Sequence, residues 1–172
     1  MKKIIYVVLA LWAIFIGNIY ADISQWKINY FVDEFGDITN HAFLDSESIN
    51  IYYGSYAWED QFCKILIDDT CVSFNLGRTF YQDWIVKTKT PDGNTNTYYC
   101  DLDECGRVYM RPYNSKHKMY VDVDRFISEL LLGSRVIAYP DNKYTNNKYD
   151  FGIVSLKLED LRKIRPDFEA KK

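Results

Sequence analysis

Four cysteines are the residues of this 172-residue chain with the clearest capacity for chemistry. An even cysteine count in an exported chain, which the N-terminus indicates, favours disulfides over metal binding or free thiols. Cys100 and Cys105 enclose four residues between two strand-like runs, so their sulfurs can face each other across a short hairpin. Cys63 and Cys71 form the remaining pair by default. Side-chain alternation across a tight turn would put them on opposite faces, so this bridge requires a wider loop or a bulge.

The cysteines and the two histidines give little basis for a metal or catalytic site. Zinc requires two close Cys or His pairs, and Cys63 and Cys71 are too far apart in the sequence to supply the second. His41 and His117 stand in polar contexts and are predicted to be surface residues. No nucleophile motif such as G-x-S-x-G occurs, and the glycines form no phosphate-binding cluster. We therefore predict no metal, no cofactor and no enzyme activity.

An acidic cluster of Asp33, Glu34 and Asp37 surrounds a glycine and raises the question of calcium binding. The calcium loop of an EF-hand needs acids at positions 1, 3 and 5 and a glutamate at position 12. This stretch lacks that spacing, so we interpret it as an acidic turn.

Aromatic side chains are the best candidates for a binding function. Alternate residues of a strand face away from the sheet, and exposed aromatics often mark binding surfaces. The alternative is that a small β domain packs its aromatics along its strands. The candidate binding surface consists of Tyr56, Trp58, Trp84 and Tyr98. The basic stretch from 107 to 118 is interpreted as a solvated face.

The first 21 residues predict a secretory signal. Two lysines follow Met1, an apolar run extends from Ile4 to Ile16, and the small residue Ala21 ends the segment. The apolar run is shorter than the ~20 residues of a membrane span, so no stable membrane insertion is expected once the signal is removed. We predict cleavage after Ala21 and one exported β-rich domain, residues 22–172, in the periplasm or outside the cell.

The charge of the predicted mature domain limits its partners. The signal contains two lysines and no acidic residue, so its removal changes the formal net charge from −3 to −5. A mildly acidic domain is a poor partner for nucleic acid and for anionic lipid. A protein or a component of the cell envelope is the expected partner.

Alternating apolar residues predict a β-rich fold. Residues 26–37 begin with Trp26, Ile28 and Tyr30 in alternation and end in the acidic turn, which predicts the founding strand of the core. The sequence from Pro91 to Gly93 predicts the clearest turn, between strands at 83–90 and 95–100. Further strands are predicted at 48–54, 62–67, 70–76, 106–111, 135–139 and 149–154.

Two short helices complete the expected fold. The first has a buried stripe at helical spacing, made of Val123, Phe126, Ile127, Leu130 and Leu131. Asp122 or Asp124 would cap its start and Gly133 its end, and Ser128 and Glu129 would face solvent. Leu158, Leu161 and Ile164 predict a weaker helix. The predicted class is all-β, mainly an antiparallel β-sandwich or flattened barrel, with two short peripheral helices.

The C-terminal third resembles the ends of two families of small secreted bacterial proteins. The matching positions are Phe126, Leu130, Gly133, Val136, Tyr149, Phe151, Ile153, Leu158 and Leu161. The pattern resembles the type VI secretion accessory proteins and the invasion-associated locus B proteins, as do the opening tryptophan and the Pro-Asp-Gly turn. The resemblance implies a secreted β-sandwich without known catalysis, and no family site residue carries over.

The expected function is non-enzymatic binding of a protein or a cell-envelope component through an aromatic surface. The first alternative is a periplasmic inhibitor or immunity-type protein that blocks a hydrolase with a loop. An enzyme of unrecognised type is the third hypothesis.

Overall fold

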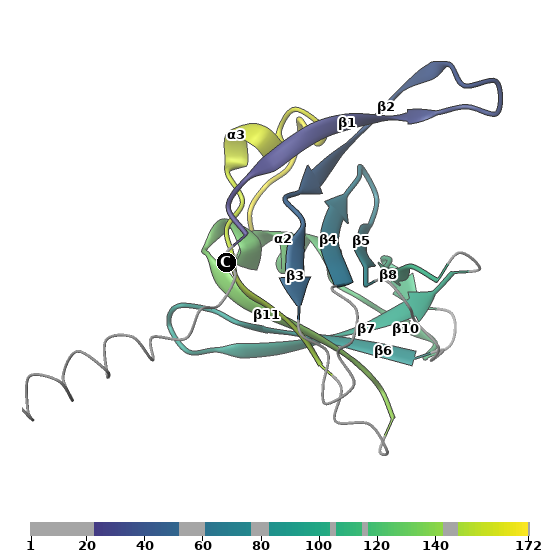
Figure 1. The fold of residues 1–172 in the computed structure, drawn as a ribbon. Helices are drawn as coiled ribbons and strands as arrows, with labels where there is room; N and C mark the ends of the chain where they lie inside the picture. Colours follow the sequence, from purple (N-terminus) through teal and green to yellow (C-terminus); the bar gives the residue numbers. More distant parts are fainter. Residues whose placement is uncertain are drawn as a thin grey trace, which may run out of the picture.

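Antiparallel strands in one curled sheet form most of the protein (Figure 1). The structure is a computed structural model that describes residues 23–51, 61–76, 83–103, 106–114, 117–142 and 148–171. The N-terminal strands are β1 (Trp26–Val32), β2 (Ile38–Ser46), β3 (Ile49–Ile51), β4 (Gln61–Ile67), β5 (Val72–Asn75), β6 (Asp83–Lys89) and β7 (Thr95–Leu102). The later elements are β8 (Val108–Met110), β9 (Tyr113–Asn114), β10 (Met119–Tyr120), α2 (Val123–Leu131), β11 (Ser134–Pro140), β12 (Tyr149–Val154) and α3 (Leu158–Leu161).

The large sheet has the strand order β1-β2-β4-β5-β8-β7-β6-β11-β12, with β3 paired to β4, and all its named pairs are antiparallel. Its two ends meet where Ile23, just before β1, forms a parallel bridge with Val154. The Ile23 amide donates to the Ile153 carbonyl at 2.9 Å, and the Ser155 amide donates to the Ile23 carbonyl at 2.7 Å. The predicted all-β class is confirmed, and this closure makes it a flattened barrel.

The turn at Pro91 forms as its sequence predicts. β6 and β7 pair from Asp83↔Asp101 to Lys89↔Thr95, and Gly93 adopts φ +92°, the left-handed region that glycine tolerates best. The Thr90 hydroxyl donates to the Asp92 carboxylate, which ties the turn together. This hairpin lies at the centre of the sheet, with β11 on its other side.

Aromatic rings from strands distant in sequence form the core. The Phe74 ring lies 5.9 Å from those of Phe126 and Phe151, and Trp84 lies 5.7 Å from Tyr149. All five side chains are fully buried. Burying a large apolar side chain stabilises a fold by about 1.5–3 kcal/mol, so this cluster joins β5, β6, α2 and β12.

Helix α2 has the predicted ends and the predicted buried stripe. The Arg125 amide donates to Asp122 Oδ1 at 3.0 Å, which caps the first turn, and Gly133 ends the helix with φ +76°. Of the stripe, Val123, Phe126, Ile127 and Leu130 are buried, and Leu131 is half-buried.

The other face of α2 is also buried, so the prediction that Ser128 and Glu129 face solvent is wrong. Ser128 is 3% exposed and Glu129 is 5% exposed. The C-terminal segment crosses this helix, and the Lys171 amide donates to Ser128 Oγ at 2.8 Å. The C-terminal segment therefore covers this part of α2, while Arg125 stays exposed. The described helices are all too short to span a bilayer.

Candidate functional site: a projecting hairpin

The hairpin of β1 and β2 extends beyond the barrel as a two-stranded ribbon (Figure 1). It is paired from Trp26↔Ser46 to Tyr30↔Ala42 and again at Val32↔Ile38. β4 pairs with β2 only at Leu44 and Asp45. Within the described part of the chain, residues 30–42 therefore have no strand partner outside the hairpin itself.

One face of the hairpin carries an apolar row that begins in the core and ends in solvent. Cross-strand pairing places Ile28 beside Leu44 and Val32 beside Ile38 on this face. Leu44 is fully buried, whereas Val32 is 58% exposed and Ile38 is 75% exposed. The predicted founding strand is thus only half correct, because its outer half leaves the core.

The opposite face of the ribbon also carries apolar side chains. The Phe31 and Phe43 rings lie 4.7 Å apart, and Phe31 is 41% exposed. The register shifts between Tyr30 and Val32, where Thr39 Oγ1 donates to the Phe31 carbonyl at 2.9 Å. The bulge holds Phe31 in place, so both faces of the outer hairpin are apolar.

Hydrogen bonds within the chain hold the acidic turn in shape. Asp33 Oδ1 accepts hydrogen bonds from the amides of Phe35 and Asp37, both at 2.9 Å, and Gly36 adopts φ +88°. This confirms the interpretation as an acidic turn. It leaves Phe35 82% exposed at the end of the ribbon.

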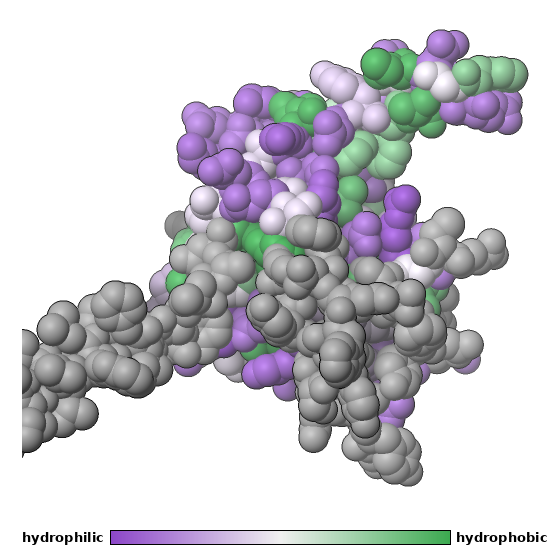
Figure 2. Space-filling view, in the orientation of Figure 1, coloured by the Kyte–Doolittle hydropathy of each residue, from purple (hydrophilic) through white to green (hydrophobic). Residues whose placement is uncertain are grey.

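We define the hairpin tip as Tyr30, Phe31, Val32, Phe35 and Ile38. These are five of the ten exposed large apolar side chains of the described residues, and they fall within nine positions of the chain. Apolar side chains gather along this projection in Figure 2. Residues 28–44 contain three acidic residues and no lysine or arginine, so the tip is both apolar and acidic.

The aromatic surface predicted from the sequence lies elsewhere and is largely not a surface. Trp84 is 1% exposed and Tyr98 is 5% exposed, so both belong to the core and that prediction is wrong for them. Tyr56 and Trp58 lie outside the described residues. The sequence signal for the hairpin tip was the break in alternation at Phe31, Val32 and Phe35, which resembles the entry of a strand into a core.

The structure does not form the predicted bridge between Cys63 and Cys71. Ile67 pairs with Val72, so the loop is wider than two residues, but it places Cys71 opposite Asp68. Cys63 lies five residues further along β4, about 16 Å away, whereas a disulfide requires Cα atoms within ~7 Å. The Cys71 thiol donates to Asp68 Oδ2 at 2.9 Å.

The predicted bridge between Cys100 and Cys105 is also not formed. Cys100 is a thiol, buried in the core beside Trp84 on the next strand, and Cys105 lies outside the described residues. Burial raises the pKa of Cys100 well above its usual value and raises that of Cys63 to about 12. Burial, with the Asp68 carboxylate, also raises the pKa of Cys71 to about 12. These thiols stay protonated and are poor nucleophiles at neutral pH.

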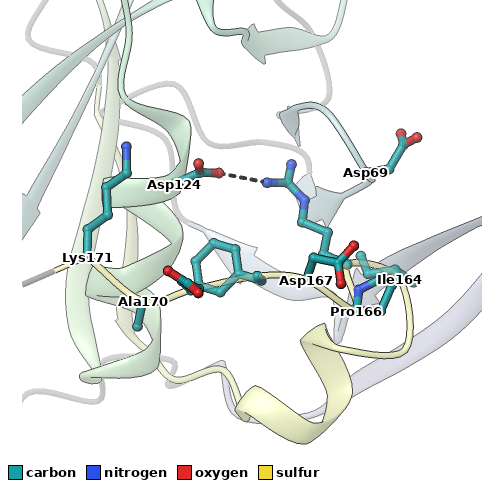
Figure 3. A pocket seen from close by; sticks show the side chains of 10 residues that line it. Asp69, Asp124, Ile164, Pro166, Asp167, Ala170 and Lys171 are labelled. Atoms are coloured by element: carbon teal, nitrogen blue, oxygen red, sulfur yellow. Dashed lines mark hydrogen bonds and ion pairs between the residues drawn. The ribbon is translucent and has the colours of Figure 1, made fainter.

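A groove of about 630 Å³ lies between the C-terminal segment and α2 (Figure 3). Arg165 Nη1 pairs with Asp124 Oδ1 at 3.1 Å, and Arg165 Nε donates to the Asp68 carbonyl at 2.7 Å. Lys171 Nζ pairs with Asp122 at 2.7 Å. These contacts attach the C-terminal segment to α2 and to the β4–β5 turn. The charged residues Arg165 and Lys171 in the groove therefore serve to hold this segment in place.

A buried carboxylate, Glu129, is the other conspicuous polar group. It accepts hydrogen bonds from the Thr88 hydroxyl and from Asn96 Nδ2, and Arg125 Nε lies 3.6 Å from it. Burial raises the pKa of the neighbouring Tyr98 hydroxyl, and the Glu129 charge raises it further. The carboxylate is fully satisfied by its neighbours, which is the pattern of a structural network.

The histidines differ from each other. His41 is exposed, as predicted. His117 is half-buried, with its ring 4.8 Å from that of Tyr99 and Nε2 3.8 Å from Asp83 Oδ1, so it is not the surface residue that was predicted. The described residues contain no group of three or more potential metal ligands.

Comparison with known proteins identifies no relative of this chain. The resemblance of the C-terminal third to small secreted proteins stays a prediction. No protein-family model matches the chain, and no curated protein or solved structure matches it.

Proposed function

We propose that this is a non-enzymatic binding protein of the bacterial cell envelope that binds a protein or an envelope component through the hairpin tip. The observation that carries the proposal is that one nine-residue projection holds half of the exposed large apolar side chains of the described residues. The signal-like N-terminus supports a periplasmic or secreted location.

The energetics of the tip favour docking. Full burial of one large apolar side chain contributes about 1.5–3 kcal/mol of stabilising free energy. The five exposed side chains of the tip would gain part of this free energy if a partner covered them. Aromatic anchors such as Phe35 supply much of the binding energy of typical interfaces. The Asp33 hydrogen bonds hold the turn in shape before binding, which lowers the entropic cost of association.

The backbone of the ribbon offers a second kind of contact. Strands at the edge of a sheet expose N–H and C=O groups that can pair with a strand of another chain. The outer half of β2 lies beyond β4, so it presents such an edge next to Phe43 and Ile38.

A second candidate function is an inhibitor or immunity-type protein that blocks a hydrolase. The narrow projecting hairpin favours it, because a two-stranded ribbon with an apolar end can enter a cleft. In this function the bound species is an enzyme, and its activity falls when the hairpin is present.

Site-specific photocrosslinking in the producing cells tests the proposal. A photoreactive phenylalanine analogue replaces Phe35, and in a matched control it replaces Ile153, which is 48% exposed on β12. We expect a discrete crosslinked product from position 35, absent from position 153 and weakened by Ile38→Ser. Equal products from both positions, or none from 35, would contradict the proposal. A hydrolase in the product would select the second function.

A further inference from the structure

The outer edge of β1 carries backbone groups that no strand of the described residues uses. The Glu47 amide donates to the Gln25 carbonyl at 3.0 Å, so these two residues form a hydrogen-bonded position of the β1–β2 ladder. In an antiparallel pair, such positions alternate with positions whose N–H and C=O groups point away from the partner strand. Counting along the register places Ile28, Tyr30 and Val32 among the latter. We call the backbone groups of these three residues the free edge of β1.

The free edge stays regular past the register shift. Between the paired positions Tyr30 and Val32, β1 has one residue, whereas the facing stretch of β2 has three, residues 39–41, so the irregularity lies in β2. Beyond it the Asp33 amide donates to the Asp37 carbonyl at 2.9 Å, so the backbone of Val32 again points away from β2. Because a bulge hinders pairing along its own strand, β1 offers the better template of the two edges of the hairpin.

The barrel leaves this edge open. β12 ends at Val154, and the chain accompanies β1 only as far as Trp26, whose indole donates to the Ser155 carbonyl at 2.8 Å. The next amide, that of Leu156, donates to the Leu130 carbonyl, so the chain has already turned toward α2. The outer half of β1 extends away from the other labelled elements in Figure 1. Within the described residues, the free edge therefore has no backbone partner.

The spacing of the free edge selects one kind of partner. Donors and acceptors recur at every second residue, about 6.8 Å apart, and an extended polypeptide repeats its own N–H and C=O groups at the same distance. A lipid or a glycan has no such repeat. Glu34 and Asp37 are exposed at the turn, and residues 28–44 contain no lysine or arginine, so a strand with a basic residue at this end complements the edge best.

We propose that the partner is another protein, which adds a β-strand to the free edge of β1 with a lysine or arginine beside the acidic turn. The inference rests on the proposed function of the hairpin tip, and it narrows the partner from a protein or an envelope component to a strand-donating protein. The apolar side chains of the tip would then continue onto the added strand on both faces of the ribbon.

Paired substitutions at Tyr30 test whether the partner binds the backbone. Tyr30→Ala and Tyr30→Pro both remove the ring, but only proline removes the amide that points toward the partner. Proline is tolerated at such an edge position, because the Tyr30 amide makes no ladder hydrogen bond with β2. Each variant carries the photoreactive phenylalanine analogue at position 35 and is crosslinked in the producing cells. Circular dichroism and thermal melting of the purified variants verify that they are folded.

We expect the proline variant to give about tenfold less crosslinked product than the alanine variant, because a carbonyl of the partner loses its donor. Glu34→Lys should also lower the yield, since it repels the basic residue of the partner. Equal yields from the proline and alanine variants would overturn strand addition and leave binding through the hairpin tip standing. A product that joins two copies of this chain would overturn the proposed partner. A parent without any product would reject the proposed function itself.

Hydrogen exchange of the purified crosslinked parent tests the same contact without a substitution in β1. The amides of Ile28, Tyr30 and Val32 should exchange rapidly in the free protein and at least about tenfold more slowly in the complex. The Asn29 amide faces β2 and should be protected in both states, which makes it the internal control. Unchanged exchange at the three edge amides would reject strand addition even if the proline variant fails to fold.

Discussion

Asn96 Nδ2 donates to Glu129 Oε1 at 2.5 Å inside the protein, on a helix face that the sequence marks as solvent-exposed. The strand β7 thereby reaches across to α2 through a polar contact, beside the apolar contact of Tyr98 with Phe126 at 5.2 Å. Helix α2 therefore packs against partners both on its apolar stripe and at Glu129, while Arg125 stays exposed.

Replacement of Glu129 by alanine should be strongly destabilising. The change removes the acceptor of the buried Thr88 hydroxyl and of the half-buried Asn96 amide, and removing one partner of such a network costs about 1–3 kcal/mol, more when a charge is involved. Urea unfolding measures the difference. Glu159→Ala, at an exposed position of α3, is the matched control and should stay within about 0.5 kcal/mol of the parent. Equal midpoints for the two variants would contradict the buried network.

Substitutions at the two ends of the projecting hairpin should differ strongly in how much they lower the free energy of unfolding. Leu44→Ala removes a fully buried side chain and should lower the free energy of unfolding by about 2–5 kcal/mol. Phe35→Ala, at the exposed turn, should change it by less than about 0.5 kcal/mol. Both are measured by urea unfolding under identical conditions. A large loss for Phe35→Ala would mean that the tip packs against the protein and does not project from it.

Stability should fall in alkaline solution because buried acidic groups keep their protons in the folded state. Burial raises the pKa of Cys63 and Cys71 from 9.0 to about 12, and it also raises the pKa of Tyr98. Below pH 9 the thiols are protonated in both states and their contribution is constant. Between about pH 9 and 12 the unfolded chain releases protons that the folded chain retains, so the free energy of unfolding falls by up to ~1.4 kcal/mol per pH unit for each group.

Urea midpoints measured at pH 8, 9 and 10.5 check this dependence. Cys71→Ala should make the alkaline decline shallower, whereas Leu132→Ala, which alters no ionisable group, should leave it unchanged. A midpoint that stays constant up to pH 10.5 would show that the thiols ionise as readily in the folded protein as in the unfolded chain.

Thiol labelling should separate the folded state from the unfolded state. Cys71 and Cys100 are 7% and 1% exposed, so both should resist a thiol reagent in the native protein and react in urea without any reductant. Mass spectrometry of tryptic peptides identifies the labelled residues. If Cys100 reacts in urea only after reduction, it is linked to another cysteine, and the hairpin bridge to Cys105 predicted from the sequence would be restored.

Local features of the fold could be predicted, because their causes lie within a few residues. The turn at Pro91 needs only a fixed proline dihedral and the left-handed Gly93, and α2 needs only its cap at Asp122 and its end at Gly133. The burial of Ser128 depends on Lys171, 43 residues later, and no periodicity within α2 contains that information.

The hairpin tip was misread for a related reason. Alternation along β1 has the same period at Ile28, which packs against the core, as at Tyr30, which is exposed. Only the point at which β4 stops pairing with β2, near Leu44, determines which part of the row is covered. Trp84 was placed on the surface by the sequence but is buried. A tryptophan on a strand has the same sequence pattern whether its face of the sheet is buried or exposed to solvent.

The barrel closes between the beginning and the end of the described chain. Ile23 pairs with Val154, and the Trp26 indole donates to the carbonyl of Ser155, 129 residues later, at 2.8 Å. A chain that is synthesised or delivered from its N-terminus cannot make either contact until β12 has emerged. Closure of the barrel therefore requires a nearly complete polypeptide. Pairing over such a long sequence separation makes folding slow compared with that of helical proteins. Until then Ile23 and Trp26 lack the partners that close the barrel.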